Sequence, residues 1–152
     1  ERYVIKNEAI KSNNNCWQGL CLGDFSIQAH KKLPTTMVLK ISVFQDSQEI
    51  FINEELTSGF KFINALNNSQ VDQNILISPL NDISKDLFSF SHQGNQLSWY
   101  APLLPAGTYY LTYQVVPQYI GLFLFQPAEI FTRFLEGSVD HNASYHIKIS
   151  SD

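Results

Sequence analysis

Residues 96–125 read QLSWYAPLLPAGTYYLTYQVVPQYIGLFLF, and three β-prone runs follow one another in this stretch. Residues 105–107 (PAG) form a turn signal between two of these runs. Successive side chains of a strand face opposite sides of a sheet, so Tyr109 and Tyr113 share one face and Tyr110 lies on the other. The stretch therefore predicts strands joined by short connections, with one face of the middle strand in a core.

The rest of the chain repeats this pattern of short, β-prone runs separated by turn-forming residues. The full set of predicted strands is residues 36–44, 49–53, 60–63, 74–78, 87–91, 96–100, 108–116, 122–125 and 144–149. Many short strands at this spacing are typical of two packed sheets. The sequence therefore predicts an all-β fold, an antiparallel two-sheet β-sandwich.

One short helix is expected in addition, at residues 127–135 (PAEIFTRFL). Pro127 suits the first turn of a helix, and Gly137 follows as a stop signal. Phe131 and Phe134 would share one face of this helix and pack against a sheet.

The composition excludes several classes of protein. The chain has 152 residues, which favours a single domain, and 44% of them are hydrophobic, too many for a disordered segment. Its formal net charge is −4, from 10 basic and 14 acidic residues, which argues against a nucleic-acid partner. No apolar run approaches the roughly 20 residues of a membrane-spanning helix, so direct membrane insertion is not expected.

The sequence carries no recognisable catalytic motif. A nucleophile elbow, a phosphate-binding loop and a dinucleotide-binding glycine motif are all missing. His141 and His146, with Asp140 beside them, could form a metal site, but histidines exposed on a loop and a strand are the favoured interpretation. We therefore expect no enzyme activity, no cofactor and no metal.

The two cysteines, Cys16 and Cys21, lie in NNNCWQGLCLGD, with a Gln-Gly turn signal between them. The spacing is not that of a zinc ribbon or a redox motif. A local disulfide is favoured over a reduced pair on a hairpin, and it would indicate an oxidising compartment.

Two further features bear on the turns and the surface. Pro105 either occupies the second position of a type II-like turn or precedes a positive φ at Gly107, and Gly121 is a second position set by backbone geometry. The aromatic residues around Trp99 and Tyr110 are core on one face and half-covered surface on the other. Alternatively, they form an aromatic platform for a sugar ring or a protein partner.

Residues 103–128 (LLPAGTYYLTYQVVPQYIGLFLFQPA) resemble the end of bacterial alpha-2-macroglobulin-like proteins. The residues that match the family's spacing are Pro105, Ala106, Gly107, Tyr113, Gly121, Phe123 and Pro127. Residues 22–24 (LGD) look like the family's strand opening, and residues 53–60 (NEELTSGF) look like a turn of the family, with Thr-Ser where Pro-Ala is usual. The family's Met-Tyr pair after the last block and its thioester signature, Cys-x-Glu-Gln, are absent from this chain.

The resemblance implies that residues 1–152 are a single C-terminal macroglobulin-like domain from a much larger, periplasmic or secreted protease inhibitor. Such a domain is non-catalytic. It docks on a thioester-containing helical domain of the same parent chain and shields it, and it meets target proteases only through the parent. The interface candidates are Tyr110, Phe131 and Phe134. The alternative is a stand-alone β-sandwich that binds glycans or a protein partner through exposed aromatic residues, including Trp99.

Cys16 and Cys21 are predicted to be bonded to each other in the mature protein. Thiol titration of the unfolded, unreduced chain should then detect no free thiol, while the same sample after reduction should release both. Two free thiols before reduction would contradict the pairing.

Overall fold

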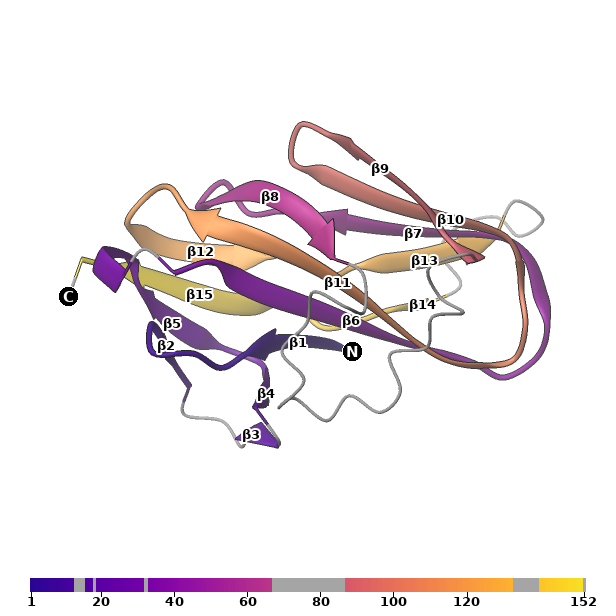
Figure 1. Ribbon diagram of the computed structural model, residues 1–152, viewed down its shortest axis with the longest axis horizontal. Coiled ribbons are helices and arrows are strands. Elements are labelled where there is room, and N and C mark those ends of the chain that lie inside the picture. Colours follow the sequence, from indigo (N-terminus) through magenta and orange to yellow (C-terminus); the bar gives the residue numbers. More distant parts are fainter. Residues whose placement is uncertain (13–15, 18, 32, 67–86, 133–139, 152) are drawn as a thin grey trace.

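The computed structural model describes residues 1–12, 16–17, 19–31, 33–66, 87–132 and 140–151, and these residues form an almost entirely β structure (Figure 1). A six-stranded sheet makes one layer of a β-sandwich. In spatial order its strands are β3 (Cys16–Trp17), β4 (Leu20–Leu22), β1 (Arg2–Ile5), β6 (Thr35–Val43), β11 (Gly107–Pro117) and β8 (Phe60–Leu66). A short 3₁₀ helix, Ala29–Lys31, precedes β6.

Two smaller sheets make the second layer. The five-stranded sheet has the order β14 (Asp140–His141), β13 (Glu129–Thr132), β7 (Ser47–Glu55), β10 (Gln96–Leu104) and β9 (Ser89–Gln93). The four-stranded sheet has the order β12 (Gly121–Phe125), β15 (Tyr145–Ser150), β5 (Phe25–Gln28) and β2 (Ile10–Lys11). All pairs are antiparallel except β15 with β5, which is parallel, so the predicted sandwich is confirmed with one parallel pair in it.

The two smaller sheets are continuous through two chain segments. β12 leads into β13, and β14 leads into β15, with only three residues between the strands in each case. Asn142 closes this junction, because its side-chain oxygen accepts a hydrogen bond from the Ala128 N–H at 2.7 Å and its own N–H donates to the Ala128 carbonyl at 3.3 Å. The second layer therefore bends without leaving these backbone groups unpaired.

The core confirms the predicted alternation along β11. Tyr109, Leu111 and Tyr113 are buried, while Tyr110 is half-buried on the opposite face, where it packs near Leu20 and Val38. Burial of the inward side chains of both layers supplies the hydrophobic free energy of the fold.

The predicted strands within the described residues are all present, with shifted ends. The predicted strand 36–44 corresponds to β6, and 108–116 corresponds to β11. The prediction for 87–91 is two residues early relative to β9. The predicted strand at 74–78 lies outside the described residues. The N-terminal strand β1 was not predicted, because only two inward-facing positions, Arg2 and Val4, define it.

The predicted helix at residues 127–135 is wrong where the structure describes it. Glu129–Thr132 is strand β13, which pairs with β7 and places Ile130 opposite Ile52 and Phe131 opposite Phe51. The Phe131 and Phe51 rings stack with centroids 5.3 Å apart. Pairing with β7 and this ring contact outweigh a weak local helix signal. Residues 133–135, including Phe134, lie outside the described residues.

At residues 104–107 the structure shows the expected positive φ at Gly107 and not the type II-like turn. Gly107 has φ 155° and Gly121 has φ 154°, while Ala106 keeps the ordinary sign of φ that a type II turn would not allow there. The Ala106 N–H donates to Asp46 Oδ1 at 2.9 Å, and the Tyr109 hydroxyl donates to the Pro105 carbonyl at 2.6 Å. Both glycines are the first residue of a strand and have φ values that residues with a side chain rarely adopt.

Replacing Gly107 or Gly121 with Val should destabilise the fold by about 1–3 kcal/mol, because a β-branched residue at such a φ is strained. Thermal unfolding should show a melting temperature several degrees lower. Ala106→Val is the matched control, since it places the same side chain in the same exposed turn at an ordinary φ. Variants of both glycines that melt within a degree of wild type would contradict the assignment.

Candidate functional site

The disulfide predicted between Cys16 and Cys21 is present. The two residues are directly opposite each other in the β3–β4 hairpin. A disulfide is typical of proteins in oxidising compartments, which is compatible with a secreted or periplasmic location. None of the helices among the described residues is long and apolar enough to cross a membrane.

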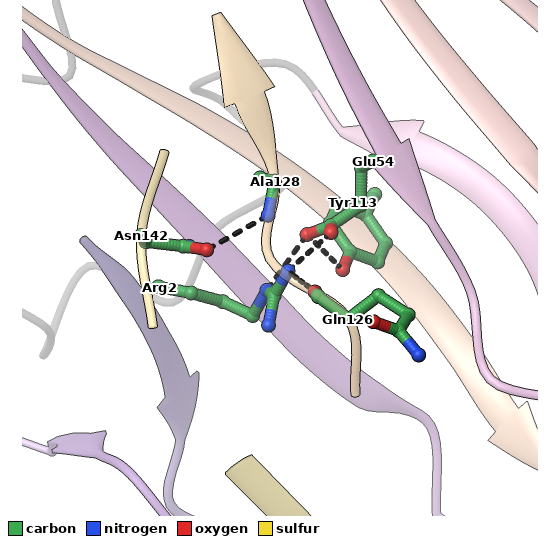
Figure 2. Close-up of polar contacts among 6 residues, drawn as sticks. All are labelled: Arg2, Glu54, Tyr113, Gln126, Ala128 and Asn142. Carbon is green, nitrogen blue, oxygen red and sulfur yellow. Dashed lines mark hydrogen bonds and ion pairs between the residues drawn. The ribbon is translucent and has the colours of Figure 1, made fainter. Parts of the chain in front are cut away.

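A buried ion pair joins the two layers of the sandwich (Figure 2). Arg2, on β1, donates from Nε to Glu54 Oε2 at 2.9 Å and from Nη2 to Glu54 Oε1 at 2.5 Å. The Tyr113 hydroxyl donates to the same Oε2 at 2.9 Å, and Arg2 Nη2 also donates to the Gln126 carbonyl at 2.6 Å. Residues from β1, β7, β11 and the β12–β13 junction therefore meet at one ion pair, with Tyr113 bound to its carboxylate and Gln126 bound to its guanidinium.

Burial and charge set the protonation of this cluster. Complete burial raises the pKa of the Glu54 carboxyl, and the charge of Arg2 acts against that rise. Burial, the largest single influence, would lower the pKa of Arg2, but the charge and hydrogen bond of Glu54 together with the nearby Tyr145 and Tyr113 raise that pKa on balance. The Arg2 guanidinium also lies 3.9 Å from the centre of the Phe125 ring. Because these side chains are sealed from solvent, the cluster can hold the layers together but cannot reach a substrate.

The outer face of the five-stranded sheet carries an open, polar hollow. Glu54 points inward, so its neighbours on β7 point outward into this hollow. The hollow has a volume of about 420 Å³. Five carboxamide side chains line it, those of Asn53, Gln93, Asn95, Gln96 and Gln126. Glu55, Glu129 and Pro127 complete the set of eight described lining residues, none of which is Lys, Arg or His.

A row of aromatic rings flanks the hollow on the same face. Phe131, Phe51 and Tyr100 occupy matching positions on β13, β7 and β10. The Phe51 ring lies 4.9 Å from the Tyr100 ring and 5.3 Å from the Phe131 ring, and all three residues are half-buried. The row is one outward position along β7 from Asn53, or about 7 Å.

A second exposed feature lies on the four-stranded sheet. Tyr119, Ile120, Leu122 and Leu124 are 62%, 64%, 69% and 44% exposed, and we call these four residues the β12 strip. β12 is the outermost strand of this sheet in the part of the chain that the structure describes. Leu122 and Leu124 project from the outer face opposite Lys148 and His146 of β15, which are also exposed.

The structure separates the predicted interface candidates. Tyr110 is half-buried on the six-stranded sheet, Phe131 is in the aromatic row of the five-stranded sheet, and Phe134 lies outside the described residues. Trp99 is only 4% exposed, so the alternative that it contacts a ligand as an exposed aromatic residue is wrong. Of the described residues, no group of three His, Cys, Asp or Glu side chains is placed to hold a metal ion.

Sequence reasoning did not identify the β12 strip or the hollow. A signal for the strip was present, because Gly121–Phe125 (GLFLF) alternates two outward leucines with two inward phenylalanines on a strand that ends a sheet. The hollow had no such signal, because its lining comes from three separate stretches of the chain, residues 53–55, 93–96 and 126–129.

Comparisons with known proteins identify no family. No family model and no curated protein match the chain. Among solved structures, the chain is similar to a non-cellulosomal cohesin from the hyperthermophilic archaeon Archaeoglobus fulgidus, with 13% identity and a TM-score of 0.47 over 84% of this chain and 86% of that one. It is also similar to the collagen-binding domain of a Staphylococcus aureus adhesin, with 12% identity and a TM-score of 0.47 over 84% of this chain and 93% of that one. Likeness this low carries no argument about function.

Removing one member of the buried ion pair should cost much more than neutralising both. Arg2→Met leaves the Glu54 carboxylate buried without its partner, and we expect a loss of about 3–5 kcal/mol in unfolding free energy. In Arg2→Met/Glu54→Gln the amide oxygen still accepts from Tyr113 and no charge is buried, so at least half of the loss should be recovered. Urea unfolding of the wild type and the two variants measures both values. A double variant less stable than Arg2→Met would contradict the role of the pair.

Proposed function

We propose that this chain is a non-catalytic docking domain, the C-terminal macroglobulin-like domain of an alpha-2-macroglobulin-like protease inhibitor. Its partner is the thioester-containing helical domain of the same parent chain, which it shields from water. The observation that carries the proposal is the β12 strip, in which two exposed leucines on the outermost strand of a sheet follow the exposed Tyr119 and Ile120. Sheet edges are normally protected by charges or proline, so an apolar one favours a covering partner.

The residues that carry the family resemblance support the proposal because they contact one another. Tyr113, of the last block, donates to Glu54, of the middle block. A side chain at Gly59 would come within 2.7 Å of the Phe123 ring, so these two motif positions are also packed together. Asp24, of the first block, accepts a hydrogen bond from the His146 N–H at 2.8 Å and so links the start of β5 to β15, which pairs with β12.

The chemistry of the strip fits a protein partner. Its leucines form an apolar centre, and Lys148 and His146 lie beside them as a polar rim, the arrangement typical of protein interfaces. An anionic membrane is a poorer partner. Two lysines, Lys148 and Lys11, lie in the outward row of this sheet and would contribute about 2 kcal/mol, and the chain as a whole carries a net charge of −4. The disulfide agrees with a periplasmic or secreted parent.

The docking role predicts the behaviour of the parent protein. Leu122→Asp/Leu124→Asp places two charges in the interface, so the thioester of the parent should react with methylamine several-fold faster, approaching the rate of a parent that lacks this domain. Leu103→Asp is the matched control, because Leu103 is 52% exposed on a different sheet.

The measurement is the rate of thiol release from the parent in methylamine. A parent without the domain that keeps the wild-type thioester lifetime and protease capture would refute the docking role. A parent reading frame without Cys-x-Glu-Gln would remove the thioester partner from the proposal.

A further inference from the structure

The hollow on the five-stranded sheet has the hydrogen-bonding character of a polyhydroxyl ligand. Each of its carboxamides can both donate and accept, as a sugar hydroxyl does, and the carboxylates of Glu55 and Glu129 can each accept from two hydroxyls. Most small-molecule pockets are lined mainly by apolar side chains, whereas Pro127 is the one apolar residue among the described residues that line this hollow. The lining therefore favours a ligand that presents hydroxyls on most sides.

The charge of the hollow restricts the ligand further. The described lining residues include two carboxylates and no cationic side chain, so they would repel a phosphate, sulfate or uronate group. A neutral ligand meets no such cost. The volume of the hollow, about 420 Å³, lies within the range of small-molecule sites.

The walls of the hollow are held in place by contacts behind and beside it. Arg2 reaches from the core to the Gln126 carbonyl at 2.6 Å, and the same guanidinium is fixed by Glu54, which lies between two lining residues of β7. On the outer face, the Ser98 hydroxyl donates to Asn53 Oδ1 at 3.0 Å and fixes that carboxamide. Such preorganisation reduces the entropy lost when a ligand binds.

The aromatic row lies beside these polar groups. Phe131, Phe51 and Tyr100 follow the hollow at the next outward position of the three strands. A chain of two or three sugar units that fills the hollow would extend over these half-buried rings, whose apolar surface suits the C–H side of a pyranose.

We propose that this hollow is a binding site for a short, neutral oligosaccharide. The proposal does not rest on the docking role, because no residue of the β12 strip lines the hollow. Affinity should be modest, in the millimolar range, because the hollow is open and each hydrogen bond replaces one made to water.

The test uses the chain itself. The ¹⁵N-labelled protein is screened on an array of neutral glycans and titrated by NMR with maltose, cellobiose, lactose and N,N′-diacetylchitobiose, and separately with calcium chloride alone. We expect at least one neutral glycan to bind and to shift the resonances of Asn53, Gln96 and Gln126. Gln96→Ala and Glu55→Ala should each weaken binding by about fivefold, the effect of one hydrogen bond.

Gln45→Ala and Glu8→Ala are matched controls, because they remove the same groups from exposed positions outside the hollow and should leave the affinity unchanged. Absence of binding to every neutral glycan overturns the proposal. Binding that shifts other residues, or that survives both hollow variants, also overturns it. If calcium alone shifts the hollow residues and no sugar does, the hollow is a cation site and the proposal is wrong.

Discussion

The pairing of Arg2 with Glu54 is the contact on which the arrangement of the two layers depends. It brings the first strand of the chain to the middle of β7, and through Tyr113 and the Gln126 carbonyl it also binds β11 and the β12–β13 junction. An unpaired charge at this depth is expensive, so each partner requires the other. Hydrophobic burial stabilises the sandwich as a whole, whereas this pair selects which residues of β1 and β7 face each other.

The inward position of Glu54 has consequences on the other side of β7. Strand alternation directs Asn53 and Glu55 outward, and the registers of β10 and β13 place Gln96 and Glu129 beside them. The polar hollow and the buried carboxylate therefore lie on opposite faces of β7, at the three consecutive residues 53–55. Because the Gln126 carbonyl is bound by Arg2, the inner ion pair also holds a wall of the outer hollow.

The two exposed features differ in what they can bind. The β12 strip presents leucines with a rim of Lys148 and His146, and suits a protein surface with an apolar centre. The hollow presents amides and carboxylates, and suits hydroxyl groups. They are on separate sheets, which join at residues 126–128.

The sequence by itself determined the all-β class, the local disulfide and the alternation that buries Tyr109 and Tyr113, because period-two patterns and five-residue spacings are local properties. Tertiary structure decided the rest. Glu129–Thr132 fits a helix or a strand, and only pairing with β7 makes it β13. Arg2 and Glu54 are 52 residues apart, and no local pattern connects them. The exposure of Leu122 and the burial of Trp99 depend on which strands cover each face, and those contacts are formed between distant parts of the chain.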